Sequence, residues 1–179
     1  TPQMRSRAKA VNFGIVYGKG EFSLAQDLHV TRKEAKAYID GYFEKYSGIK
    51  KYMENIVETG KEQGFVETVF GRRRYIPELK SSNFMLRSSG ERMALNTPIQ
   101  GTAADIIKIA MVKVYNALKA ENLKSKLILQ VHDELLIETY IPEKEKVKKI
   151  LKECMESACD LKARLVAEVG EGKTWYDAH

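Results

Sequence analysis

Apolar side chains recur at helical spacing through most of the first hundred positions. They predict helices over residues 2–16, 23–30, 31–46, 49–63 and 84–96. Thr31 and Glu34 have the spacing of a capping box, which marks a helix start, and Gly64 marks a helix end. Residues 65–76 carry β-forming side chains on both sides of Gly71, which predicts a small hairpin. The first part of the chain is therefore expected to be mainly helical.

The pattern changes after residue 97. A broadly apolar helix is predicted from about residue 98 to residue 122, as in a helix that packs against a sheet. Further elements are predicted over residues 126–139 (two strands), 142–160 (an amphipathic helix) and 164–172 (a last strand). Together they indicate an α+β fold that is mostly helical, with a small antiparallel sheet in its later part. We expect two structural regions, residues 1–90 and residues 91–179.

Length and composition restrict the class of protein. A chain of 179 residues can bury a sizeable core. No stretch approaches the roughly 18 uninterrupted apolar residues of a membrane span, and no charged-then-apolar leader is visible. Cys154 and Cys159, the only cysteines, lack metal-type spacing and are expected to be reduced core residues, with a redox pair as the alternative. We therefore expect a cytoplasmic protein.

Positive charge is concentrated in the first part of the chain. Residues 1–100 contain 17 Lys and Arg against 11 Asp and Glu, whereas residues 101–179 contain 13 of each, so the net charge of +6 lies entirely before residue 101. The run Arg72-Arg73-Arg74 belongs to this excess. The asymmetry favours an anionic partner for the first part, with a merely solvated face as the alternative.

The first predicted helix carries a stripe of two cations followed by two aromatic rings. Arg5, Lys9, Phe13 and Tyr17 are four residues apart, which places them on one face spread over roughly 120°. Two cations near a helix N-terminus suit a polyphosphate, and the rings beyond them suit a sugar and a base. Gly14 would let another backbone or a base approach this helix closely. The alternative is an exposed cationic end followed by two core aromatics.

Two later segments carry further polar side chains in suggestive places. Asp133 lies between two predicted strands and is a possible ligand for a metal ion in phosphoryl chemistry, although residues 132–133 can equally be a simple hairpin turn. Upstream, three residues spaced by four suit base edges and the acceptors of the minor groove, with capping and turn formation around Pro98 as the alternative: Arg92, Asn96 and Gln100.

Four motifs, taken in order, resemble family A DNA polymerases, the bacterial DNA polymerase I type. The pattern R-x-x-x-K-x-x-N-F-G-x-x-Y-G at 5–18, in which the cations are Arg5 and Lys9, is similar to the fingers-helix motif (motif B), and "VHDE" at 131–134 is similar to palm motif C. The segments "GRRRYIPEL" at 71–79 and "ERMALNTPIQGTAADIIKIAM" at 91–111 also resemble that family. So does the ending "GKTWYDAH". The resemblance covers essentially the whole chain.

The resemblance implies a helical fingers subdomain over residues 1–90 and the later part of the palm subdomain over residues 91–179. It implies that Arg5 and Lys9 bind the triphosphate of the incoming nucleotide, with Lys9 also counted as catalytic. It implies further that Phe13 faces the sugar and that Tyr17 lies near the templating base and the insertion site.

The resemblance also implies roles for the later residues. Three of them would contact the minor groove of primer–template DNA: Arg92, Asn96 and Gln100. Around the palm hairpin, His132 would contact the primer terminus, Asp133 would be a catalytic metal ligand, and Glu134 would be an acidic neighbour that supports catalysis. The implied cofactor is Mg²⁺, and the implied partners are primer–template DNA and deoxynucleoside triphosphates.

One family motif has no counterpart in these residues. Motif A, a palm strand that bears a second aspartate and a sugar-screening glutamate, is not found in residues 1–179. We therefore expect template-directed DNA synthesis from the C-terminal portion of a longer enzyme, and little activity from the chain alone, because Asp133 lacks its metal-sharing partner. The missing N-terminal part would then be a partner, covalent or as a separate chain.

Two alternatives to this function stay open. A non-catalytic module that binds nucleic acid or nucleotide, or one half of a split polymerase, would use the same stripe without turnover. Single-subunit RNA polymerases share the logic of motif B, but Asn12-Phe13-Gly14 and the Glu134 of "HDE" resemble the DNA enzymes instead.

Overall fold

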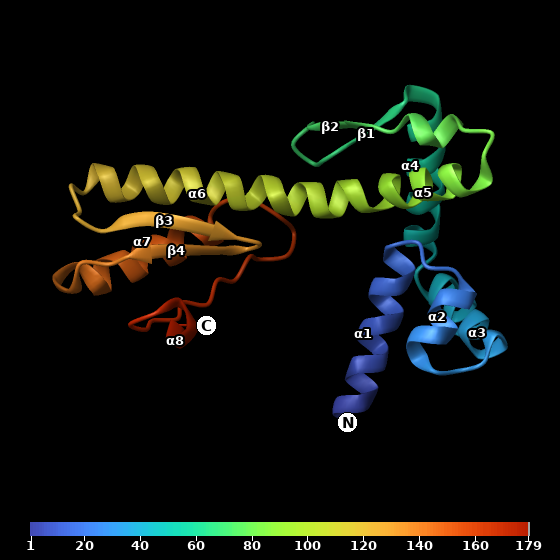
Figure 1. The fold of residues 1–179 in the computed structure, drawn as a ribbon, viewed down its shortest axis with the longest axis horizontal. Coiled ribbons are helices and arrows are strands. Elements are labelled where there is room, and N and C mark those ends of the chain that lie inside the picture. Colours follow the sequence, from blue (N-terminus) through green and yellow to red (C-terminus); the bar gives the residue numbers. More distant parts are fainter. Residues whose placement is uncertain (179) are drawn as a thin grey trace. The chain divides into compact units, whose positions relative to one another are not determined.

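The computed structural model describes residues 1–178 and divides into two compact units, Thr1–Gly101 and the remainder from Thr102. Helices dominate both units, and each unit contains one small antiparallel sheet (Figure 1). The expected α+β fold with mostly helical content is therefore confirmed. Among the described residues, no helix combines the length and the apolarity needed to cross a membrane.

The first unit consists of helices with one small hairpin. Its elements are α1 (Pro2–Val16), α2 (Glu21–Leu28), α3 (Arg32–Lys45), α4 (Ser47–Gln63), β1 (Phe65–Glu67), β2 (Arg73–Tyr75), the 3₁₀ helix η1 (Pro77–Lys80), α5 (Phe84–Asn96) and the π-helical turn η2 (Thr97–Gly101).

Local capping chemistry sets several of these boundaries. The Thr31 hydroxyl accepts a hydrogen bond from the Glu34 amide (3.3 Å), and the Glu34 carboxylate accepts one from the Thr31 amide (2.9 Å), which completes the predicted capping box of α3. Helix α4 ends at Gly64, whose φ of 82° is left-handed and suits glycine. These boundaries follow from residues that are close in sequence.

Two apolar clusters hold the first unit together. Leu24, Leu28 and Ala35 join α2 to α3, with Ala10 and Val11 of α1 packed against them. The second cluster joins the hairpin, η1 and α5 through Val66, Ile76, Leu79 and Ala94. Each fully buried aliphatic side chain contributes about 1.5–3 kcal/mol of transfer free energy.

The second unit packs helices against a hairpin. Its elements are α6 (Thr102–Ala120), β3 (Lys126–Val131), β4 (Glu134–Glu138), the 3₁₀ helix η3 (Ile141–Glu143), α7 (Lys144–Glu156) and the short α8 (Trp175–Ala178). Strands β3 and β4 pair antiparallel, with a register irregularity between Leu127 and Leu129.

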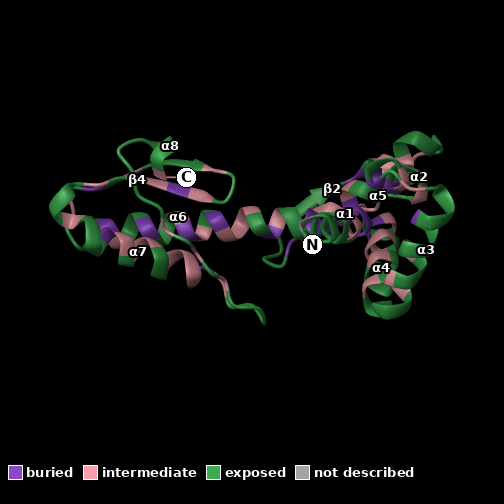
Figure 2. Cartoon of the chain, turned by 90° about the horizontal axis from the view of Figure 1, so that it is seen from below, coloured by how far each residue is buried: buried purple, intermediate pink, exposed green. Residues whose placement is uncertain are grey.

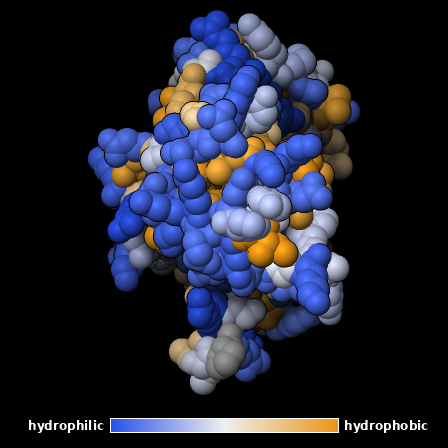
Figure 3. All heavy atoms as spheres, turned by 90° about the vertical axis from the view of Figure 1, so that its left-hand side faces the viewer, coloured by the Kyte–Doolittle hydropathy of each residue, from blue (hydrophilic) through white to orange (hydrophobic). Residues whose placement is uncertain are grey.

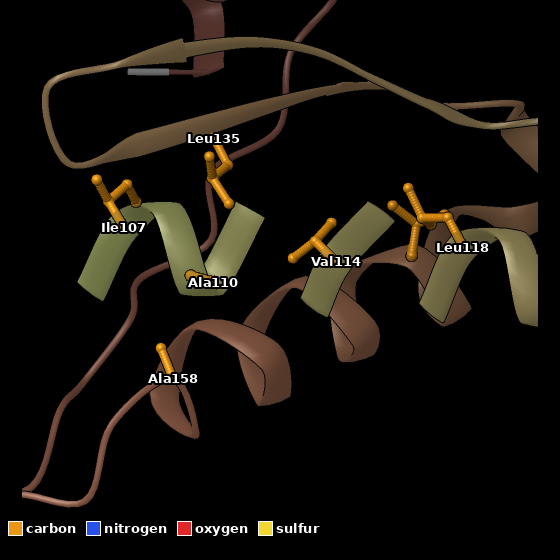
Figure 4. Close-up of a cluster of buried hydrophobic side chains, with 7 residues drawn as sticks. Ile107, Ala110, Val114, Leu118, Leu135 and Ala158 are labelled. Carbon is orange, nitrogen blue, oxygen red and sulfur yellow. The ribbon is translucent and has the colours of Figure 1, made fainter. Parts of the chain in front are cut away.

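One face of α6 forms the core of this unit. Ile107, Ala110, Val114 and Leu118 are spaced along that face and contact Leu135 of β4 as well as Val147 and Ala158 (Figure 4). Buried and exposed positions alternate along α6 accordingly (Figure 2). The outer surface is more polar: the face drawn in Figure 3 is mainly hydrophilic, with apolar groups dispersed between charged ones.

The prediction of a last strand over residues 164–172 is wrong. None of these residues belongs to a strand, and the backbone of Ala167 bonds instead to side chains of α7. The Ala167 amide donates to Glu156 Oε1 (3.2 Å), and its carbonyl accepts from Lys152 Nζ (3.2 Å). A strand needs a neighbouring strand to satisfy its backbone, and at Ala167 helix side chains satisfy it instead.

The chain contains two cysteines. Cys154 and Cys159 are both free and half-buried, and burial raises the pKa of the Cys154 thiol.

Along the chain, the boundary between the two compact units falls between residues 101 and 102, at the end of η2. The assignment of residues 1–90 to fingers and 91–179 to palm stays a prediction.

Candidate nucleotide-binding and DNA-binding residues

Helix α1 presents its predicted stripe to solvent. Arg5 and Lys9 are exposed, and neither forms an ion pair with an acidic side chain within the described residues 1–178. The Lys9 ammonium lies 5.8 Å from the centroid of the Phe13 ring, and the Phe13 and Tyr17 rings lie 5.8 Å apart. The first turn of α1 contains no acidic residue that would offset the positive end of the helix dipole. The stripe is therefore continuous, and its cations are available to an anion.

The exposure of Phe13 decides between the two interpretations of its ring. Phe13 is 49% exposed, whereas the next residues, Gly14 and Ile15, are buried. The alternative that both aromatics are core residues is therefore wrong for Phe13, and Tyr17 is half-buried. The apolar face of α1 that packs inward consists of Ala10, Val11 and Ile15.

Gly14 has an internal role and not one toward a ligand. A Cβ atom at Gly14 would lie 3.2 Å from Leu24 Cδ1, which is tighter than ordinary contact. The glycine thus allows α1 to approach α2 closely on its buried side. Of the two predicted approaches, that of another part of the backbone fits this packing of α2 against α1, whereas the approach of a base does not, because the position faces Leu24 and not solvent.

The end of α1 packs against α5. Gly18 has a φ of 74°, a left-handed conformation that suits glycine, and a Cβ there would lie 2.9 Å from Leu95 Cδ1 and 3.6 Å from Arg92 Cγ. Arg92 is exposed on α5. The structure therefore brings Arg92 beside the segment that directly follows Tyr17.

A π-helical turn separates Asn96 from Gln100. Pro98 has no amide hydrogen and cannot donate to the carbonyl four residues before it, so the chain widens into η2 rather than continuing as an α-helix. The Thr97 hydroxyl donates to the Met93 carbonyl (2.7 Å) and satisfies one group at this break. The helix predicted over about residues 98–122 accordingly begins as an α-helix only at Thr102.

Asn96 and Gln100 differ in their surroundings. Gln100 is exposed at the end of η2. Asn96 is half-buried, and its Oδ1 atom is buried without a hydrogen-bond partner in the part of the chain that the structure describes. A buried acceptor without a donor is uncommon in folded proteins. The two side chains therefore differ in accessibility, with Gln100 open to solvent and the Oδ1 atom of Asn96 enclosed.

The segment around Asp133 forms a two-residue hairpin turn. Val131 pairs with Glu134, so His132 and Asp133 connect β3 to β4, and His132 has the positive φ of 50° that tight hairpins favour. Gln130 Nε2 donates to the His132 carbonyl (2.7 Å) and braces the turn. The turn interpretation is confirmed. It also leaves His132 and Asp133 exposed at the tip, where they can contact a ligand.

Glu134 is tied to the C-terminal helix. Trp175 Nε1 donates to Glu134 Oε2 over 3.3 Å. The carboxylate is half-buried, unlike that of the exposed Asp133. The two neighbouring acids therefore have different surroundings, as expected for successive residues at the start of a strand.

The described residues do not by themselves fit a two-metal centre. No group of three or more His, Cys, Asp and Glu side chains in residues 1–178 is arranged to hold a metal ion. Asp133 supplies a single carboxylate. Two-metal chemistry requires carboxylates from more than one segment.

Two arginines contact η2 directly, although the sequence showed them only as members of the run Arg72-Arg73-Arg74. Arg72 Nη2 donates to the Gly101 carbonyl (3.0 Å), and Arg74 Nη1 donates to the Thr97 hydroxyl (3.3 Å). Arg73, between them, pairs instead with Glu67 (2.8 Å) and lies over the Phe65 ring. The sequence contains a signal for this difference. In an extended chain, residues two apart lie on the same side, so Arg72 and Arg74 share one side and Arg73 faces the other.

Comparison with known proteins identifies the class. The chain matches the model of DNA polymerase family A over residues 1–177, and it therefore belongs to that family. Family A DNA polymerases are generally metal-dependent.

Individual relatives are bacterial DNA polymerase I proteins. The chain is 57% identical over 177 residues to DNA polymerase I of Caldicellulosiruptor bescii, covering 99% of this chain and 21% of that protein. It is 53% identical over 178 residues to the DNA polymerase I of Bacillus caldotenax, covering 99% of this chain and 20% of the relative. The chain thus spans about a fifth of the length of the curated relatives it matches.

A solved structure has the same fold. The POL domain of Pol1 from M. smegmatis, in complex with DNA primer–template and dNTP, matches with a TM-score of 0.94 and 44% sequence identity. The match covers 99% of this chain and 31% of that one.

Proposed function

We propose that this chain provides the nucleotide-binding helix and part of the DNA-binding surface for template-directed DNA synthesis. The reaction is attack of a primer 3′-OH on the α-phosphorus of a deoxynucleoside triphosphate, with release of pyrophosphate. The observation that carries the proposal is the exposed stripe of α1, in a chain that belongs to DNA polymerase family A. The bacterial relatives support cytoplasmic DNA replication or repair as its setting.

In this proposal, Arg5 and Lys9 bind the triphosphate. Both cations are exposed on one face of α1, and their mutual repulsion is relieved by an anion that they share. Lys9 also neutralises charge that develops on the departing pyrophosphate, which makes it catalytic. Phe13 then faces the sugar, and Tyr17, one turn on, lies near the templating base.

Three residues of the first unit serve primer–template DNA: Arg92, Asn96 and Gln100. The exposure of Arg92 and Gln100 supports this role, because side chains with free donors and acceptors suit base edges in the minor groove. The net charge of the first hundred residues adds a sequence-independent attraction for phosphates.

At the hairpin tip, His132 contacts the primer terminus and Asp133 provides one carboxylate to a magnesium ion. Glu134 supports the tip through its bond to Trp175. The described residues offer no complete donor set for a magnesium ion. The remaining carboxylates have to come from residues outside this sequence.

Nucleotide binding tests the role of α1. We expect R5A and K9A each to weaken binding of a fluorescent dNTP analogue about tenfold or more. R7A is the matched control, because Arg7 is an exposed cation on the same helix but lies about 200° around its axis from Arg5. Equal weakening by all three variants would reduce the effect to general charge and contradict the proposal.

Primer extension tests the completeness of the site. In the presence of Mg²⁺, the 179-residue chain is expected to bind primer–template DNA without extending it. Robust extension by this chain would overturn the expectation that a second aspartate-bearing segment is required. Absence of both dNTP and DNA binding would instead contradict the proposed function itself.

A further inference from the structure

The turn η2 needs external support to hold one conformation. Pro98, the second residue of η2, has no amide hydrogen, so the turn lacks one backbone donor that an α-helix would have at this position. Gln100 lies within it and Asn96 directly precedes it. A small change in the turn would therefore redirect the side chains to which DNA binding is assigned.

The hairpin β1–β2 supplies that support from one side. Its loop is fixed by Thr68, whose amide donates to the Arg72 carbonyl (3.0 Å) and whose hydroxyl accepts from the Arg72 amide (3.2 Å). Thr68 is 5% exposed. A Cβ atom on Gly101 would lie 2.7 Å from Thr68 Cγ2, so the loop and the end of η2 are in close contact.

Two arginines of the hairpin bond to opposite ends of the turn. Arg72 donates to the carbonyl of Gly101, the last residue of η2, and Arg74 donates to the hydroxyl of Thr97, its first residue. The Thr97 hydroxyl in turn donates to Met93 in α5 (2.7 Å). The contacts therefore bind both ends of η2 to one hairpin, through Arg72 of its loop and Arg74 of β2.

We propose that Arg72 and Arg74 are positioning residues that hold η2 so that Asn96 and Gln100 face the DNA duplex. This inference rests on the proposed function for its DNA-binding consequence, but the conformational role can be measured without DNA. A guanidinium suits the task because its charged donors form strong, directional bonds to carbonyl and hydroxyl oxygens.

The first experiment measures the turn itself. In the full 179-residue chain without DNA, R72Q is expected to accelerate amide hydrogen exchange of residues 99–101 about tenfold or more relative to wild type. R73Q is the matched control, because it removes the same charge from the adjacent position of the hairpin, and Arg73 contacts Glu67 and Phe65 instead of η2. Equal exchange in R72Q and R73Q would overturn the positioning role.

The second experiment asks whether Arg72 acts through Gln100. Affinity for a fluorescent primer–template is measured for R72Q, Q100A and the double variant. We expect R72Q to weaken binding about tenfold in the wild-type background and to have little further effect in the Q100A background. A merely structural or electrostatic role would give additive losses, and that result would overturn the inference.

The R72K variant and the binding of primer–template by the wild-type chain separate failure of the positioning role from failure of the proposed function. R72K retains the charge and one donor, so it is expected to lie between wild type and R72Q in both assays, and it replaces R72Q where the latter fails to fold. Failure of the wild-type chain to bind primer–template would contradict the proposed function and the DNA-binding part of the inference. The exchange measurement would still decide whether the arginines hold the turn.

Discussion

The indole N–H of Trp175 donates a hydrogen bond to Glu134 Oε2 over 3.3 Å, which ties the C-terminal helix α8 to the start of β4. Trp175 is the only tryptophan in the chain, so its fluorescence reports on this contact directly. E134A is expected to shift the emission of Trp175 to longer wavelength, because the indole loses its acceptor and becomes more hydrated. E134Q, which keeps an acceptor oxygen, should shift it less. E138A removes an exposed acid from the same strand and serves as the control, and equal spectra for E134A and E138A would contradict the contact.

Two helical glycines make opposite predictions for stability. A Cβ at Gly90 of α5 would lie 2.9 Å from the Leu79 amide nitrogen and 3.0 Å from the Glu78 carbonyl carbon, both of them backbone atoms. G90A is therefore expected to lower the free energy of unfolding by about 1–3 kcal/mol through overpacking. At Gly41 of α3 nothing lies within 4 Å, so G41A is expected to raise it by about 0.5–1 kcal/mol through helix propensity. Denaturant unfolding measures both, and a shift of the same sign in both variants would show that the packing difference is not decisive.

The ring of Phe13 allows a prediction about sugar selection. It is 49% exposed on α1 and so is accessible to a ligand. A tyrosine hydroxyl can replace the hydrogen bond of a missing 3′-OH, whereas a phenyl ring cannot. F13Y, in an intact polymerase that contains this chain, is expected to ease incorporation of 3′-deoxy chain terminators. A competition assay between terminator and natural nucleotide checks it, and equal discrimination by the two proteins would refute it.

The acid stability of the second unit should depend on Glu143. Backbone hydrogen bonds from Lys124 lower the pKa of the Glu143 carboxyl, with further bonds from the amide and hydroxyl of Ser125. Because the pKa is lower in the folded than in the unfolded state, the carboxylate stabilises the fold above its unfolded pKa, and this contribution is lost as pH falls through the folded value. E143Q is expected to lower stability at neutral pH and to flatten the acid limb of the stability curve.

Denaturant unfolding from about pH 3 to about pH 7 measures this dependence, because carboxyl groups ordinarily titrate in the lower part of that range. E145Q is the matched control two residues along the chain, because Glu145 lies in the first turn of α7 and pairs with Lys148 of that helix instead of with residues 124–125. If E143Q retains the full wild-type acid limb, the hydrogen bonds to Glu143 do not contribute to it.

Short-range signals predicted most of the helices and both hairpins. The capping box of Thr31 and Glu34, the end of α4 at Gly64 and the turn at Gly71 depend on residues only a few positions apart. Their hydrogen bonds form within one helical turn or one hairpin. The sequence therefore contains all the information that these boundaries require.

Signals failed where a segment's partner lies elsewhere in the chain. Residues 164–172 have the side chains of a strand, but Glu156 and Lys152 of α7 satisfy the backbone of Ala167 instead. Gly14 has the flexibility that a ligand site can use, yet it faces Leu24 of α2. Neither outcome can be read from the local pattern, because side-chain packing between elements selects among several locally acceptable roles.

By itself, the sequence determined the α+β class, the order of the helices and the four-residue spacing that puts Arg5, Lys9, Phe13 and Tyr17 on one face of α1. These properties follow from helical and strand periodicity, which is a local property of the backbone. Only the tertiary structure decided that this face is exposed while Gly14 and Ile15 are buried, and that Arg72 and Arg74 bond to η2 while Arg73 does not. The physical reason is that burial and hydrogen-bond partners depend on contacts between residues distant in sequence, and these exist only once the elements have packed together.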